Sequence, residues 1–167
     1  MKTISLKQRG VVILEALIAI LIFSIGILGL IAMYANSQTQ AGDAQYRIEA
    51  TNHANQLMNE IWISADRWPD DTNLFNTIQS FGFNANGGAC VFNGGFAVAP
   101  GNAAVTALLG RLTAAGTGLP GSGAPQLQVL VTDAAQNHQV QITICWQTPT
   151  DRANGEFRRQ VLVANVS

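Results

Sequence analysis

Two cysteines, Cys90 and Cys145, are the residues whose type and spacing most clearly indicate chemistry. A zinc site needs more closely spaced pairs and further ligands, so this pair does not fit one. In a chain that crosses a membrane, as the apolar N-terminal segment of this one indicates, an even pair is typical of one disulfide in an oxidising compartment. We therefore expect a Cys90–Cys145 disulfide, with two buried free thiols as the alternative.

The histidines and clustered carboxylates predict no catalytic or metal site. His53 and His138 are the only histidines, and because they lack metal-ligand spacing we expect both at the surface. Asp66, Asp70 and Asp71 form an acidic cluster that could bind Ca²⁺, although a solvated turn is the preferred interpretation. The sequence has neither a Gly-x-Ser-x-Gly turn nor a phosphate-binding loop. We expect no metal, no cofactor and no enzymatic activity.

Glu15 is the single charged residue between Val11 and Gly42. A carboxylate is costly in hydrocarbon, so an acid inside such a run normally has a partner. One interpretation places Glu15 near the lipid headgroups, where it stays hydrated. Another depends on a cut after Gly10, which would give Val11 a new α-amino group. Glu15 then lies four residues further on, about 6 Å along a helix axis.

The new amine could neutralise Glu15 in two ways. Within one helix, the positive N-terminal end favours a nearby carboxylate. Between two staggered helices, the Val11 amine of one subunit could pair with Glu15 of the next. Such a pair would select one axial register, as a buried polar group does in a coiled coil.

The segment that contains Glu15 is long and apolar enough to span a membrane. Residues 1–10 carry three basic side chains and no acid, and Ala16–Met33 carries no charge. As a helix, Val11–Met33 would rise about 34 Å, which exceeds a hydrocarbon core of about 30 Å. The basic residues keep the N-terminus in the cytoplasm. The bulk of the chain is therefore expected across the membrane.

A conventional cleaved signal peptide is the alternative for this segment. Its apolar core is usually about 7–15 residues long and is followed by a small-x-small site. Here the apolar run is longer, contains Glu15, and is followed only by a weak Thr39-x-Ala41 site. This alternative predicts a secreted adhesive module that begins near Gly42.

These residues together resemble the class III signal of type IV pilins and related pseudopilins. The pattern is a basic leader ending in Arg9-Gly10, an apolar start at Val11, an acid at the fifth position after the glycine, and a long apolar run. The continuation Phe23–Leu30 is similar to minor pilins of the PilV type. In that family an inner-membrane prepilin peptidase cuts after the glycine and methylates the new N-terminus. The resemblance thus implies cleavage between Gly10 and Val11, N-methylation of Val11 and an assembly role for Glu15.

The resemblance implies a minor type IV pilin, because Val11 replaces the usual Phe of major pilins and Ala32 lies near the place of their helix-kinking Pro. Such a subunit would act in pilus initiation, assembly or tip function, and hence in adhesion or motility. Its partners would be other major and minor pilins, the prepilin peptidase and the inner-membrane assembly machinery. It would lie in the bacterial inner membrane, with a periplasmic head, before it joins the pilus at the cell surface. A minor pseudopilin of a type II secretion system is the nearest alternative, and a membrane-anchored enzyme or sensor is another.

The helix is expected to continue beyond the membrane, from about Val11 to about Ser64, because no proline precedes Pro69. Residues 11–35 are apolar nearly all round and suit lipid or a bundle interior. Residues 36–64 have two faces and must pack on a domain of the same chain. The apolar side holds Ala44, Ile48, Ala54, Leu57, Met58 and Ile61, and the polar side holds Gln45, Glu49, Asn52, His53, Gln56 and Glu60.

Residues 65–167 are expected to form a small α+β head, pilin-like in layout. A short helix capped by Asp71-Thr72 and a second helix over Asn102–Ala115 are predicted. Turn residues fill Asn84–Gly95 and Gly116–Pro125.

Three antiparallel strands are predicted by apolar alternation, and they are Gln126–Thr132, Gln139–Gln147 and Phe157–Val166. Asn154-Gly155 favours a hairpin between the last two. Cys145 falls on the polar face of its strand, so a disulfide to Cys90 would tie the Asn/Gly-rich loop over the outer sheet face. We expect the three tryptophans, Trp62, Trp68 and Trp146, to build the head core.

Composition agrees with one modest domain and argues against nucleic-acid binding. The 167 residues have a formal net charge of −1, and only 11% are charged. Loss of residues 1–10 would leave six basic against ten acidic side chains. Such a surface has no basic patch to hold a phosphate backbone.

Overall fold

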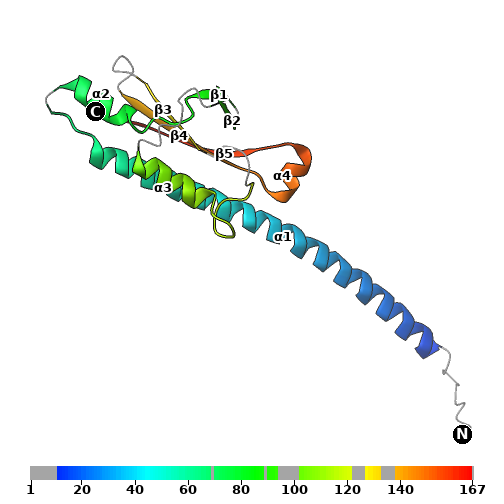
Figure 1. The fold of residues 1–167 in the computed structure, drawn as a ribbon. Coiled ribbons are helices and arrows are strands. Elements are labelled where there is room, and N and C mark those ends of the chain that lie inside the picture. The colour runs from blue at the N-terminus through cyan, green and yellow to red at the C-terminus, as the bar shows by residue number, and fades with distance from the viewer. Residues whose placement is uncertain are drawn as a thin grey trace, which may run out of the picture. The chain divides into compact units, whose positions relative to one another are not determined.

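The computed structural model describes residues 11–68, 70–88, 90–93, 102–121, 127–132 and 138–166. The leader 1–10, including Gly10, and the Pro69 that was expected near the end of the helix lie outside the described residues. The chain divides into two units, one ending at Ala44 and one running from Gln45 to Ser167. Figure 1 shows the elements of the fold, which is α+β as predicted.

Helix α1 (Val11–Ser64) has the bounds that the sequence predicts. In the first unit its large apolar side chains are all exposed, from 40% at Ile27 to 73% at Met33. A helix that is apolar all round and left exposed by the described residues is suited to lipid or to neighbouring helices.

In the second unit, α1 packs one side into the core. The buried residues recur three or four positions apart, as expected of one helix face, and they are Ala50, Ala54, Leu57, Met58 and Ile61. The prediction was wrong at Ala44 and Ile48, which are exposed. The packed side thus begins later than hydrophobic periodicity suggested, because periodicity alone does not locate the domain that covers a face.

Two shorter helices contribute to the same core. Helix α2 (Asp71–Gln79) buries Leu74 and Ile78, and its N-cap is Asp70, one residue before the predicted cap. The Asp70 carboxylate accepts a hydrogen bond from the Asn73 N–H at 2.9 Å.

Helix α3 (Ala103–Leu112) is capped by the Asn102 side chain, which accepts from the Ala104 N–H at 3.0 Å. Its buried residues are Val105, Leu108 and Leu112. The helix predicted over Asn102–Ala115 is confirmed, and its C-terminal end lies earlier.

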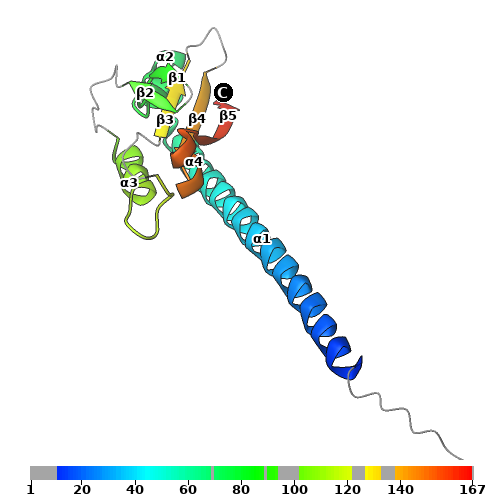
Figure 2. The ribbon, with the colours of Figure 1, turned by 90° about the vertical axis from the view of Figure 1, so that its right-hand side faces the viewer.

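The main sheet consists of β3 (Leu127–Val131), β4 (Gln139–Trp146) and β5 (Arg158–Asn165) in the antiparallel order β3-β4-β5. All three predicted strands are therefore confirmed. The register sets Val129 opposite Ile142 and Ile142 opposite Leu162. Figure 2 shows the sheet in a second orientation.

The link from β4 to β5 differs from the predicted tight hairpin. It contains helix α4 (Pro149–Asn154), which begins with a capping box between Thr148 and Asp151. Gly155 follows in the left-handed region at φ 69°, a conformation that favours glycine. The Asn-Gly pair therefore ends a helix here, although the antiparallel pairing of β4 with β5 is as expected.

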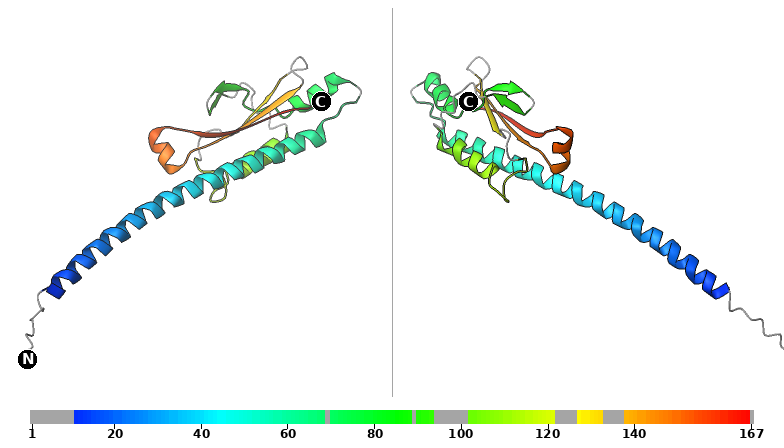
Figure 3. Two further views of the ribbon diagram at one scale, coloured as in Figure 1. Left: turned by 180° about the vertical axis from the view of Figure 1, so that it is seen from behind. Right: turned by 45° about the vertical axis from the view of Figure 1, so that its right-hand side comes forward.

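A small hairpin of β1 (Asn86–Gly88) and β2 (Val91–Asn93) was not predicted as strands. Its residue Phe92 is buried with Cys90, Cys145 and the partly buried Phe157. Cys145 lies on the sheet face opposite to Ile144 and Trp146, so the hairpin covers the outer face. Figure 3 shows the hairpin and the second-unit part of α1 on different sides of the sheet.

The tryptophan prediction holds for one residue of three. Trp146 is 1% exposed in the core between the sheet and the helices, whereas Trp62 is 40% and Trp68 is 81% exposed. Trp68 follows the last turn of α1, and no described element buries it. The core consists of side chains from α1, α2, α3 and the sheet, and it does not include these two tryptophans.

Candidate functional site on the N-terminal helix

Glu15 and Val11 lie one helical turn apart at the beginning of α1. Both are exposed, and with Leu14 and Ile18 they line a shallow apolar depression on the helix surface. Four residues of α-helix correspond to about 6 Å along the axis. A charge on the Val11 amine and the Glu15 carboxylate would therefore fall on neighbouring turns of the same helix.

The surroundings of Glu15 are apolar in every direction along α1. Among the described residues, α1 is the one helix long and apolar enough to cross a membrane, and its most apolar window has a mean hydropathy of 2.9 and no buried residue. This property is compatible with membrane anchoring. A Cβ added at Gly26 or Gly29 would meet no atom within 4 Å, so the chain itself does not require glycine there.

The disulfide is the second feature with defined chemistry. Cys90 and Cys145 are bonded, with their Cα atoms 5.8 Å apart. The predicted pairing is confirmed, and the alternative of two free thiols is wrong. Cys90 has φ 68°, an uncommon conformation for a residue other than glycine, and the bond anchors it beside the sheet.

The histidines differ from the prediction. His138 is buried, with φ 45°, and its ring centroid lies 6.0 Å from that of Phe75. His53 is half-buried. Their Nδ1 atoms have no hydrogen-bond partner in the described part of the chain. Among the described residues, neither ring belongs to a group of candidate metal ligands, and neither Nδ1 is bonded to a carboxylate that could orient it, so neither arrangement indicates a catalytic histidine.

No group of three or more histidine, cysteine or acidic side chains is placed to hold a metal ion within the described ranges. The acidic residues Asp66 and Asp70 are used locally. Asp66 accepts from the Trp68 N–H at 3.0 Å, and Asp70 caps α2. These contacts agree with the turn that the sequence favoured over a calcium site.

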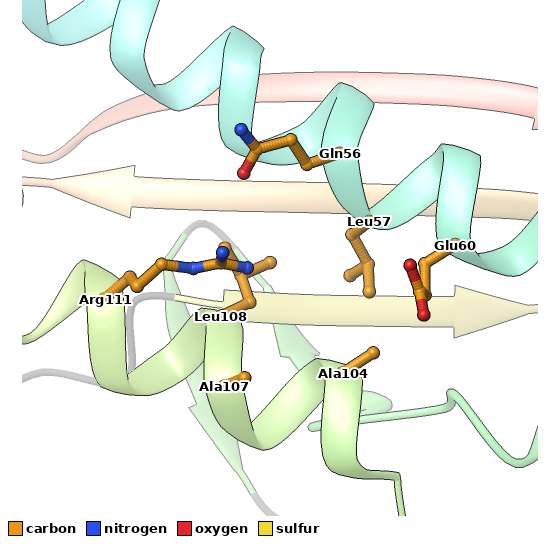
Figure 4. Close-up of a pocket in the computed structure, with 7 residues that line it drawn as sticks. All are labelled: Gln56, Leu57, Glu60, Ala104, Ala107, Leu108 and Arg111. Carbon is orange, nitrogen blue, oxygen red and sulfur yellow. The ribbon is translucent and has the colours of Figure 1, made fainter.

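A groove of about 360 Å³ lies between the second half of α1 and α3. Buried Leu57 and Leu108 are at its base, and the exposed side chains of Gln56, Glu60 and Arg111 stand around it. In Figure 4 the Arg111 guanidinium lies towards Gln56 and the Glu60 carboxylate towards Ala104. No nucleophile stands beside a general base here, so the groove has no set of catalytic residues.

A network of Thr148, Asp151 and Arg158 was not predicted from the sequence. The Asp151 carboxylate accepts from the Thr148 hydroxyl at 2.7 Å and from Arg158 Nε at 2.7 Å. The signal was present as Thr148-Pro149-x-Asp151, a helix-start pattern with proline at the first position. Its role is structural, because it fixes α4 to the beginning of β5.

Comparison of the chain with protein-family models, with curated proteins and with solved structures gives no match.

Proposed function

We propose that this chain is a minor type IV pilin, a structural subunit that is processed by a prepilin peptidase and joins or primes a pilus. The observation that carries the proposal is Glu15, a lone acid one turn from the beginning of an exposed apolar helix. An apolar helix of this length is stable only in lipid or among other apolar helices. The acid then needs a partner, and a neighbour's Val11 amine is a suitable one.

The second unit supports the same role. It has its own core of α1, α2, α3 and the sheet, and a disulfide suited to an oxidising compartment. A domain of this kind can fold in the periplasm while residues 11–35 remain in the inner membrane. We assign it contact with other pilins and with the assembly machinery, without catalysis, cofactor or nucleic acid.

Mass spectrometry of the mature protein tests the proposal. The expected species begins at Val11 and carries one N-methyl group. Gly10→Ala should leave an uncut precursor, visible as a larger band on a gel. A mature chain that begins near Gly42 would exclude the pilin function, because the apolar helix would then be a discarded signal.

Shearing of cells separates a pilus subunit from the two alternatives. A minor pilin is expected in the sheared filament fraction together with the major pilin. A pseudopilin of a type II secretion system has the same processed N-terminus, but it would stay with the cell envelope. A membrane-anchored enzyme or sensor would do so with residues 1–10 uncut.

A further inference from the structure

Among the described residues, no other strand covers one side of β5. In an antiparallel pair, residues alternate between those that exchange hydrogen bonds with the partner strand and those that do not. The Val166 N–H donates to the His138 carbonyl at 3.1 Å, so this pair belongs to the bonded set. Every second pair along the register belongs to the same bonded set, so the set also includes the β4 pairs of Ala164, Leu162, Gln160 and Arg158.

The alternate residues of β5 therefore direct their backbone N–H and C=O groups away from β4. We call them the edge residues, and they are Arg159, Val161, Val163 and Asn165. A hydrogen bond on the other side of β4 supports this assignment. The Thr132 N–H donates to the Gln139 carbonyl at 3.0 Å, so Gln139 bonds towards β3 and leaves Asn165 opposite it unbonded.

The opposite edge of the sheet is closed, in contrast. Phe83 and Val129 exchange two backbone hydrogen bonds of 3.0 and 2.9 Å at the outer side of β3. Asn84 Nδ2 donates to the Leu127 carbonyl at 3.0 Å. In the described part of the chain, no comparable partner reaches the edge residues of β5.

The side chains of the edge residues are also accessible. Val161 is 38% and Val163 is 48% exposed, on the sheet face that carries the disulfide. The strand sequence RRQVLVAN has no proline or lysine, two residues that commonly protect an edge strand from pairing. An eight-residue strand with exposed valines is a template for an added strand.

Charge indicates which kind of strand fits. Strand β5 carries Arg158 and Arg159 and no acid. Arg158 pairs with Asp151, whereas no carboxylate of the described residues lies within ion-pair distance of Arg159. A second copy of β5 would bring arginine, valine or asparagine opposite Arg159 and no carboxylate. An acid-bearing strand of a different protein is the better complement.

We propose that the β5 edge binds an extended, acid-bearing segment of another protein, which pairs antiparallel with the edge residues and becomes a fourth strand of the sheet. Apolar residues of that segment lie opposite Val161 and Val163, and its acid lies opposite Arg159. The proposal does not depend on the filament function, because it follows from the backbone and side chains of the second unit alone.

A designed peptide tests this with the full chain in detergent micelles. Acetyl-Thr-Ser-Val-Ser-Val-Ser-Glu-amide places its valines opposite Val163 and Val161 and its acid opposite Arg159. Saturable binding is expected, together with slower hydrogen exchange at the amides of the edge residues. Peptide binding that leaves those amides unprotected would overturn the proposal, as would no binding.

The peptide backbone provides a matched control that leaves the protein unchanged. N-methylation of the two peptide valines removes two of the N–H groups that face β5, whereas N-methylation of the two serines that follow the valines alters groups that face solvent. We expect about a tenfold loss of affinity with the first peptide only, which corresponds to about 1.4 kcal/mol. Equal losses would contradict pairing through the edge.

Two variants locate the site on the protein. Val161→Pro removes an outward N–H that bonds to nothing in β4, and Val161→Thr is its control. Arg159→Glu should abolish binding of the acidic peptide. The same variant should bind a peptide that has lysine in place of glutamate. If the parent chain self-associates and the Val161→Pro variant does not, the edge binds a second copy of the chain and the proposal is overturned.

Discussion

Arg158 and Asp151 form a bidentate ion pair between the first residue of β5 and helix α4. Arg158 Nε donates to Asp151 Oδ2 at 2.7 Å, and Nη2 donates to Oδ1 at 3.1 Å. The hydrogen bond from Arg158 is the main cause that lowers the pKa of Asp151 from its usual 3.8 to about 2. Hydrogen bonds from Thr148 act in the same direction, and burial opposes them.

This pair predicts a specific loss of stability in acid. Because the folded-state pKa of Asp151 lies below the unfolded value, its contribution is present above pH 3.8 and is lost as the pH falls towards 2. The size is on the order of 2 kcal/mol in the free energy of unfolding. Urea unfolding at pH 6, 4 and 2.5 measures it. Asp151→Asn should be less stable than the parent at pH 6. Between pH 4 and 2.5 its free energy of unfolding should fall by less than that of the parent. If both proteins lose the same amount, the pair does not contribute.

The disulfide joins residues 55 positions apart, so its removal should destabilise the second unit strongly. In the loop-entropy model a closure of this length contributes roughly 4 kcal/mol. We expect the double variant Cys90→Ala/Cys145→Ala to lose most of that in urea unfolding.

The single variants and local hydrogen exchange serve as controls for the disulfide. Cys90→Ala alone should match the double variant, because either change opens the same loop. The amides of Val91 and Phe92 should exchange faster, since the hairpin is attached to the sheet through Cys145. Unchanged exchange there would mean that apolar packing around Phe92 alone holds the hairpin.

Much of the fold was predictable because its signals are local in sequence. The bounds of α1 follow from an uninterrupted helical segment, and β3, β4 and β5 follow from apolar alternation. The disulfide followed from the cysteine count and the cellular compartment that the apolar segment implied.

The parts that were missed depend on tertiary contacts. Sequence places Ile48 and Ala54 on one side of α1, but only the position of the domain decides that Ile48 is exposed and Ala54 buried. His138 is polar and follows a turn pattern, yet it is buried against Phe75. The open side of β5 could not be predicted either, because it depends on which strands are neighbours and on hydrogen-bond parity.

The tryptophans provide a test of the core. Trp146 is buried and Trp68 is exposed, so Trp146→Ala should cost about 3–5 kcal/mol of unfolding free energy. Trp68→Ala should stay within about 0.5 kcal/mol of the parent. Trp146→Phe isolates the indole N–H, which has no acceptor among the described residues. We expect it to cost far less than the alanine variant. A large cost for Trp68→Ala would place that side chain in a contact outside the described core.

Glu15 tests the assembly mechanism separately from membrane insertion. Glu15→Ala removes the one charge between Val11 and Gly42, which makes the segment more apolar and so should leave insertion intact or improved. Assembly should fail, because a neighbour's Val11 amine loses the carboxylate that fixes the axial register. Carbonate extraction measures insertion, and the sheared filament fraction measures assembly.

Glu15→Gln keeps the size and hydrogen-bonding capacity but not the charge. If charge pairing is the cause, the glutamine variant fails like the alanine variant. If Glu15→Gln assembles normally, a hydrogen bond suffices and the ion-pair mechanism is wrong.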